Sequence, residues 1–203
     1  MTKPKAIVFD LGKVLVDFDY TIASRRIADR SEVGAGEVQE LICGSALHER
    51  FETGRLTSME FFEAVRAATR FSGTMVEFMQ FFADIFTPIE SMIRLHTAIR
   101  QQRIPTFIFS NTNALAIEHI RNRFPFFGGF NGYVFSYEEG AMKPDPAIYD
   151  VVERRTDLRG QDILYLDDRP ENIASGASRD WQVILQEDAE RTWIQMRRLG
   201  ILA

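Results

Sequence analysis

Cysteine is almost absent from this sequence, since Cys43 is the only one among 203 residues. A disulfide within the chain is therefore excluded, and a reducing compartment such as the cytoplasm is expected. Long apolar runs are also missing, because none approaches the roughly 20 residues that a membrane-spanning helix requires. The N-terminal segment MTKPKAIVFD meets charged residues too early for a signal peptide. We therefore expect a cytoplasmic protein without a membrane segment.

An excess of basic residues is lacking as well. Lys and Arg number 24 against 29 Asp and Glu, which gives a net charge of −5. A nucleic-acid partner is not expected, because too little basic charge is available to neutralise phosphates. Repeats, low-complexity tracts and Gly/Ser-rich linkers are absent, and nothing in the sequence indicates an obligate protein partner. The length suits one domain, or one domain that carries a small insertion.

What the sequence does contain is a series of short apolar runs separated by helical patterns. The runs are not alternating, which is typical of parallel strands with both faces covered. The predicted strands are Ala6–Phe9, Pro105–Phe109, Tyr133–Phe135, Ile163–Leu166 and, as a fifth candidate, Val183–Leu185. The predicted helices between and after them are Ile89–Gln102, Asn113–Arg123, Pro146–Arg155, Pro170–Arg179 and Ala189–Leu199. This alternation predicts an α/β fold with a doubly wound parallel sheet.

The stretch from Asp17 to Pro88 interrupts that rhythm. It contains no convincing strand and no lysine, and its patterns are helical. Thr57 and Glu60 form a capping-box pattern at the start of one helix. We therefore predict a core domain made of residues 1–16 and 89–203, with a helical subdomain, residues 17–88, inserted after the first strand.

Polar residues follow the predicted strands at the points where they end. Asp10 follows the first strand, Ser110 the second, Lys143 the third, and Asp167 and Asp168 the fourth. Ligands of doubly wound sheets bind beyond the carboxyl ends of the strands, so these residues should converge. Carboxylates suit Mg²⁺, a hydroxyl and a lysine suit a phosphate, and a carboxylate can also act as a nucleophile.

The ordered set of motifs resembles the haloacid dehalogenase superfamily of phosphohydrolases. The segments VFDLGKVLVD, FIFSNTN, SYEEGAMKPDPAIY and ILYLDDRPENI resemble its four motifs in order, over residues 5–187. The helical insertion resembles the small cap of the family's first cap class. The resemblance implies a Rossmann-like core and a Mg²⁺-dependent phosphomonoester hydrolase that works through an aspartyl phosphate. A small phosphorylated metabolite would be its substrate.

The resemblance also implies a role for each metal-site residue. Asp10 would be the nucleophile and a Mg²⁺ ligand. The main-chain carbonyl of Gly12 would be a second ligand and Asp168 a third. Asp167 stands where the family has glycine, so a supporting or water-mediated role is expected for it.

Further residues would hold the phosphate. Ser110 and the N–H of Asn111 would bind the transferring phosphoryl group. Lys143 would offset the charge that the nucleophile and the phosphate accumulate. Glu138 and Asn172 also match family positions, and orienting roles are expected for them, with Glu138 positioning Lys143.

Gly12 is a departure from the family pattern. Most phosphatases of the superfamily have Asp here, which protonates the leaving group and then activates water. Its absence should slow both half-reactions, because general acid–base catalysis contributes roughly 10²–10⁴ in rate. Asp17, Asp19 and His48 are candidates for a substitute, whereas a solvated lysine such as Lys13 is a poor base at pH 7. Alternatively, the substrate has an easily departing group, which favours sugar 1-phosphates or other activated phosphomonoesters.

Three other functions compete with this one. A 2-haloacid dehalogenase would have Asp-x-Tyr where this chain has Asp-x-Gly, and a phosphonate hydrolase would need a lysine in the insertion. A catalytically weak protein that binds phosphate or regulates remains an alternative. The residues expected to read the substrate lie in the insertion: His48, Arg50, Phe51, Glu52 and Arg55.

Overall fold

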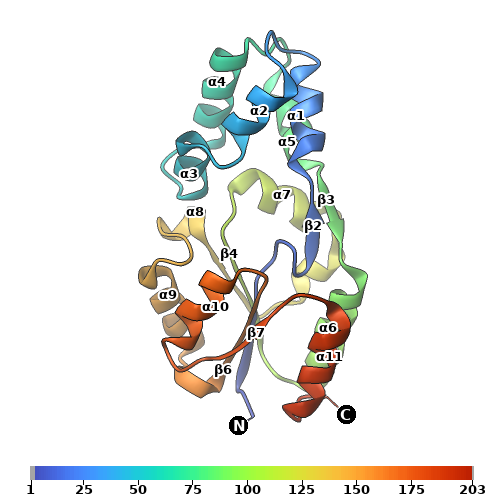
Figure 1. Cartoon of the computed structure of the whole chain (residues 1–203), viewed down its shortest axis with the longest axis vertical. Coiled ribbons are helices and arrows are strands. Elements are labelled where there is room, and N and C mark those ends of the chain that lie inside the picture. Colours follow the sequence, from blue (N-terminus) through green and yellow to red (C-terminus); the bar gives the residue numbers. More distant parts are fainter. Residues whose placement is uncertain (1–2, 203) are drawn as a thin grey trace.

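A single parallel sheet of five strands organises the computed structural model, which describes residues 3–202 (Figure 1). Its strand order is β5–β4–β1–β6–β7, so the chain winds outward from β1 in both directions. The strands are β1 (Ala6–Phe9), β4 (Thr106–Ser110), β5 (Gly132–Phe135), β6 (Ile163–Asp167) and β7 (Gln182–Leu185). The predicted α/β class and all five predicted strands are confirmed.

Helices cover both faces of the sheet, which explains why its strands are apolar throughout. In the central strand, Ile7 and Phe9 pack into one hydrophobic cluster with residues of α6, α7 and α11. Val8 points to the opposite face and packs with residues of α9. The covering helices are α6 (Glu90–Gln101), α7 (Ala114–Arg123), α9 (Pro146–Thr156), α10 (Pro170–Ala177) and α11 (Ala189–Arg198). Shorter elements complete this part: η1 (Pro125–Gly129), α8 (Ser136–Glu139) and η2 (Gly160–Asp162).

Five further helices form a bundle above the carboxyl ends of the strands, at the top of Figure 1. They are α1 (Tyr20–Ala28), α2 (Ala35–Ile42), α3 (Ala46–Glu52), α4 (Ser58–Thr69) and α5 (Met75–Ala83). The bundle has its own core, rich in phenylalanine, in which Phe51 stacks on Phe61 with ring centroids 4.3 Å apart. The predicted capping box is present, since the Thr57 hydroxyl accepts from the Glu60 N–H and the Glu60 carboxylate accepts from the Thr57 N–H.

The expectation that the insertion contains no strand is wrong. β2 (Val16–Phe18) and β3 (Phe86–Pro88) pair antiparallel where the chain enters and leaves the bundle. Each strand has only three residues, and the partners lie about seventy residues apart, so no local pattern indicated them. The pair joins the two connections between sheet and bundle into one short ribbon.

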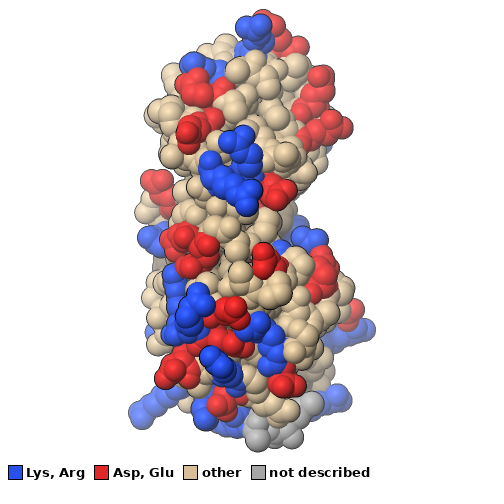
Figure 2. All heavy atoms as spheres, turned by 90° about the vertical axis from the view of Figure 1, so that its left-hand side faces the viewer, with Lys and Arg blue, Asp and Glu red and all other residues tan. Residues whose placement is uncertain are grey.

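The surface in Figure 2 carries acidic and basic side chains mixed over both parts of the molecule. Within residues 3–202, none of the helices combines the length and the apolar character needed to cross a membrane.

Candidate active site

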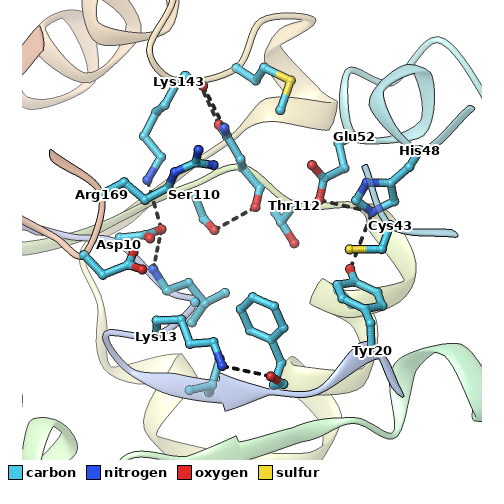
Figure 3. Close-up of a pocket in the computed structure, with 18 of the residues that line it drawn as sticks. Asp10, Lys13, Tyr20, Cys43, His48, Glu52, Ser110, Thr112, Lys143 and Arg169 are labelled. Carbon is cyan, nitrogen blue, oxygen red and sulfur yellow. Dashed lines mark hydrogen bonds and ion pairs between the residues drawn. The ribbon is translucent and has the colours of Figure 1, made fainter. Parts of the chain in front are cut away.

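A cavity of about 480 Å³ lies between the carboxyl ends of the sheet and the bundle (Figure 3). The strand ends of β1, β4 and β6 line one side, with Asp10, Ser110 and Asp168 among the lining residues. Helices α1 and α3 line the other side with Tyr20 and His48. Its size is that of ordinary small-molecule sites. The predicted convergence of distant segments at one sheet edge is thus present in the structure.

Asp10 follows β1 and is 7% exposed, so its carboxylate lies at the bottom of the cavity. Oδ1 accepts a hydrogen bond of 2.7 Å from the Leu11 N–H and lies 2.9 Å from Nζ of Lys143. Burial raises the pKa of Asp10 to about 7, with a further contribution from the charge of Asp167, against the opposing effect of Lys143. An additional positive charge next to Asp10 would therefore stabilise its ionised carboxylate.

Lys143 connects the carboxylates of the charged cluster. Its Nζ lies 2.9 Å from Asp10, donates to Asp167 Oδ2 at 2.6 Å and donates to the Phe109 carbonyl at 2.9 Å. Burial opposes the charged form, but the two carboxylates outweigh it and raise the pKa of Lys143. Asn111 holds its backbone, because the Asn111 Nδ2 donates to the Lys143 carbonyl and the Lys143 N–H donates to Asn111 Oδ1. Lys143 is therefore charged and fixed in place.

Asp167 is fully buried and surrounded by donors. Besides Lys143, its carboxylate accepts from the Tyr165 hydroxyl, from Asn172 Nδ2 at 3.0 Å and from the Arg169 N–H at 2.8 Å. Burial would raise its pKa, but the charge and hydrogen bond of Lys143 dominate and lower it. Asp167 therefore belongs to the support of Lys143, and Asn172 lies where the sequence analysis expected an orienting group.

Asp168 is the more open of the two neighbouring carboxylates. It lines the cavity and is half-buried, and among residues 3–202 no side chain donates a hydrogen bond to it. Burial and the charge of Asp167 raise its pKa. Ligand atoms of Asp10, Asp167 and Asp168 all lie within 4.8 Å of one another, close enough for one cation.

The phosphate-binding candidates lie at the end of β4 and in the turn that leads to α7. Ser110 is 3% exposed yet lines the cavity, and its hydroxyl donates to the Asn111 carbonyl at 3.2 Å. Thr112 also lines the cavity, and its N–H donates to the Ser136 hydroxyl. The Asn113 side chain caps α7 by accepting from the Ala116 N–H. This turn therefore places a hydroxyl beside the Asp10 and Lys143 pair.

Glu138 is not brought to this cluster. It is exposed, and its carboxylate accepts from the hydroxyl of its neighbour Tyr137, whereas Lys143 has its carboxylate partners in Asp10 and Asp167. The short helix α8 points Glu138 to solvent.

The insertion contributes fewer of its expected residues than the sequence suggested. His48 and Glu52 line the cavity. Phe51 is instead part of the bundle core, and Arg50 and Arg55 are exposed and not among the lining residues. One turn of helix separates His48 from Glu52, which is why these two share a face.

The bundle wall holds a second cluster of titratable groups. His48 Nε2 lies 3.5 Å from the Tyr20 hydroxyl and 3.6 Å from Glu52 Oε1, and Cys43 lies beside them (Figure 3). Burial lowers the pKa of His48 to about 4 and raises that of Tyr20. Burial, with the charge of Asp10, raises the pKa of Glu52 to about 7. Tyr20 could not be predicted from the sequence, because an aromatic residue at the start of a helix carries no distinctive signal.

Gly12 lies in the cavity wall opposite an aromatic ring. A Cβ at Gly12 would lie 2.8 Å from Cε1 of Phe18, so the ring occupies the space of any side chain there. Of the proposed substitutes, Asp17 pairs with Lys13 and Asp19 caps α1 by accepting from a backbone N–H. Neither Asp17 nor Asp19 is among the cavity-lining residues.

The fold and the site together are those of an α/β enzyme whose reaction centre lies at the carboxyl ends of its strands. A family model described as haloacid dehalogenase-like hydrolase matches residues 4–178. The chain therefore belongs to the haloacid dehalogenase-like hydrolases, as its motifs predicted.

Individual relatives are distant. The chain is 22% identical to the sesquiterpene phosphatase astK of Aspergillus oryzae, over 96% of each chain. It is 23% identical to a D-ribitol-5-phosphate phosphatase of Bacteroides thetaiotaomicron, over 91% of this chain and 92% of the relative. A crystal structure of a HAD family enzyme of B. thetaiotaomicron, in complex with magnesium and inorganic phosphate, matches with a TM-score of 0.82. That match has 18% identity and covers 94% of this chain and 99% of the other. The predicted enzyme class, a phosphatase of this family, agrees with the names of both curated relatives.

Proposed function

We propose that this protein is a Mg²⁺-dependent phosphomonoester hydrolase that forms an aspartyl phosphate on Asp10. The observation that carries the proposal is the cluster at the strand ends. A buried carboxylate, Asp10, lies 2.9 Å from a fixed ammonium group, Lys143, beside the hydroxyl of Ser110 and the open carboxylate of Asp168. One cavity thus supplies a nucleophile, a lysine that neutralises charge, a hydrogen-bond donor for the phosphate and a carboxylate that can bind a metal.

The donor set fits magnesium, which takes oxygen ligands and keeps several waters. Asp10 and Asp168 would hold the ion together with the carbonyl of Gly12. Asp167 is saturated by its four hydrogen-bonding partners and is left to orient Lys143. When bound, Mg²⁺ would offset the negative charge of the phosphoryl oxygens and favour the ionised form of Asp10. The magnesium and phosphate in the related crystal structure support this assignment.

The side chains then divide the work. Asp10 attacks phosphorus, and the Ser110 hydroxyl and the Asn111 N–H donate to the phosphoryl oxygens. Lys143 stays protonated between Asp10 and Asp167 and neutralises the charge that builds up as phosphate approaches. Because Asn111 also binds the backbone of Lys143, the phosphate site and the lysine are held as one unit.

The substrate we propose is a small phosphorylated metabolite such as a sugar phosphate, handled in the cytoplasm, with the bundle acting as a cap. Part of the cavity lining is apolar, with Val16, Phe18 and Phe86, and another part carries His48 and Glu52. An organic group with both carbon surface and hydroxyls would suit this mixed lining. The names of the two relatives described above span a terpene and a polyol phosphate, so they leave the organic part open.

Hydrolysis of p-nitrophenyl phosphate with and without Mg²⁺ tests the proposal, followed by a panel of phosphorylated metabolites. Turnover that requires Mg²⁺ and stops with EDTA is expected. No turnover of any phosphomonoester in the presence of Mg²⁺ would instead favour a protein that only binds phosphate.

A further inference from the structure

In the described part of the chain, the cluster at the strand ends offers no group that can protonate a leaving alcohol. Asp10 is the nucleophile, Lys143 is held between two carboxylates, and position 12 is glycine with Phe18 over it. A good alkyl phosphatase needs that proton, because an alkoxide is a poor leaving group. The structure therefore raises the question of which other cavity residue can supply it.

The direction in which the leaving oxygen departs determines where the proton donor must lie. In an in-line displacement the leaving oxygen departs on the side of phosphorus opposite to the nucleophile. Asp10 lies at the strand ends, so the leaving oxygen points towards the bundle. Figure 3 shows Glu52 on that opposite side of the cavity, with Ser110 and Thr112 between it and Asp10.

Glu52 is placed there by the packing of α3. It is the last residue of the helix, and only 14% of its side chain is exposed. Gly54 follows with φ +68°, and a Cβ at this position would lie 2.1 Å from the carbonyl oxygen of Tyr137. Glycine thus lets the end of α3 contact α8, which brings Glu52 over the cavity.

The neighbours of Glu52 leave its carboxyl group available for proton transfer. The Gly44 N–H donates to His48 Nδ1, so the proton of the neutral imidazole lies on Nε2, the atom that faces Glu52 and Tyr20. Asp10, Lys143 and Arg169 act on Glu52 by charge from across the cavity, and Cys43 adjoins it from the end of α2. Glu138 and Glu139 of α8 are engaged elsewhere, with Tyr137 and Arg155. The pKa of Glu52, raised to about 7 by burial and then by Asp10, is matched to a proton donor and acceptor near neutral pH.

We propose that Glu52 is the general acid and base of this enzyme, supplied by the bundle in place of the missing carboxylate at position 12. The inference rests on the proposed function. In the first step Asp10 Oδ bonds to phosphorus and the bond from phosphorus to the ester oxygen breaks. That oxygen keeps the electron pair of the broken bond and takes the proton of Glu52. It then leaves as the hydroxyl group of the alcohol.

In the second step the Glu52 carboxylate takes a proton from water as the water oxygen bonds to phosphorus. The bond between phosphorus and Asp10 breaks, its electron pair returns to the Asp10 carboxylate, and inorganic phosphate leaves. Glu52 is protonated again, so the cycle closes. With this acid in place an activated leaving group is not required, and ordinary alkyl phosphates become substrates.

Four esters of nearly equal size test the role of Glu52: ethyl, fluoroethyl, difluoroethyl and trifluoroethyl phosphate. Fluorination lowers the pKa of the leaving alcohol while the size barely changes. We expect Glu52→Gln to lower kcat/KM for ethyl phosphate by roughly 10²–10⁴, and progressively less along the series. In the natural protein, the rate with ethyl phosphate should fall above neutral pH as Glu52 loses its proton. In Glu52→Gln we expect this fall to disappear. Glu63→Gln, an exposed carboxylate of α4 paired with Arg66, is the matched control and should change neither.

An equal loss for all four esters would overturn the proposal, because a carboxylate that only binds or supports structure does not respond to leaving-group pKa. Asp10→Asn in the same assay keeps this failure separate from failure of the phosphatase assignment. If Asp10→Asn is inactive while Glu52→Gln loses the same factor everywhere, only the role of Glu52 is wrong. If Asp10→Asn keeps full activity, the proposed function itself fails.

Discussion

Gly12 and Phe18 form a complementary pair at the mouth of the candidate site. The glycine has no positive φ to maintain, so backbone conformation does not require it. What requires it is the ring of Phe18, which packs edge-on against Tyr20 with centroids 5.7 Å apart. The place where the family pattern would put an acid is therefore filled by an aromatic side chain.

Gly12→Asp should consequently be disruptive and should not create a better enzyme. Its Cβ would collide with Phe18, and displacing a packed ring costs about 1–3 kcal/mol. We expect a lower thermal unfolding temperature and no gain in turnover of alkyl phosphates. Gly12→Asp combined with Phe18→Ala removes the collision and serves as the control. A single Gly12→Asp variant with unchanged stability and faster alkyl phosphate hydrolysis would contradict this view of the pair.

Asp167 and Asp168 are adjacent in sequence but differ in surroundings. Their substitutions should therefore affect different properties, stability for Asp167 and Mg²⁺ binding for Asp168. Asp168→Asn should raise the Mg²⁺ concentration needed for activity with little change in stability, because it has no side-chain partner in the described part of the chain. Asp167→Asn removes a buried partner of Lys143, and breaking a buried pair costs about 3–5 kcal/mol. Magnesium titrations and thermal unfolding separate the two effects. Equal Mg²⁺ dependence in both variants would mean that the metal assignment of this pair is wrong.

Residues at strand ends were the predictable part of the site. Asp10, Ser110, Lys143 and Asp168 each follow an apolar run, and parallel strands bring such positions together whatever the details of packing. Glu52 could be named as a cavity candidate, but its place opposite Asp10 depends on how α3 docks. That docking is set by tertiary contacts, which leave no periodic signal in the sequence.

Among the helices and strands, the contact between α3 and α8 positions the side of the cavity that the bundle forms. Gly54 is the residue that permits it, since its missing side chain accommodates the Tyr137 carbonyl. The ribbon of β2 and β3 is the other connection, and it was not foreseen because three-residue strands carry too few side chains for an alternating pattern. Long elements were predictable, and short ones that depend on a distant partner were not.

Gly54→Ala should move the end of α3 away from α8. The positive φ costs of order 1–3 kcal/mol, and the collision adds a similar amount by overpacking. Gly200→Ala is the control, because Gly200 also has a positive φ, +66°, but no atom within 4 Å of its Cβ position. We expect Gly54→Ala to lose more stability than Gly200→Ala and also to lose turnover of ethyl phosphate. Equal losses of stability, with activity retained, would show that this contact does not set the site.

At the scale of the whole molecule, the sheet and the bundle supply different chemistry to one cavity. The sheet edge carries the proposed nucleophile Asp10, Lys143 and the proposed metal ligand Asp168, whereas the bundle carries Tyr20, His48 and Glu52. The four segments that resemble the family's motifs all belong to the sheet half or its immediate connections. This division explains why the family could be predicted from the sequence while the substrate could not.

Asp10→Asn is the most direct test of our proposal that Asp10 is the nucleophile of a Mg²⁺-dependent phosphatase. The amide preserves shape and removes the charge, so circular dichroism should show an intact fold. We measure Mg²⁺-dependent hydrolysis of p-nitrophenyl phosphate, whose good leaving group makes cleavage of the ester bond insensitive to the general acid. We expect the variant to lose this activity entirely. Undiminished Mg²⁺-dependent hydrolysis in folded Asp10→Asn would contradict it.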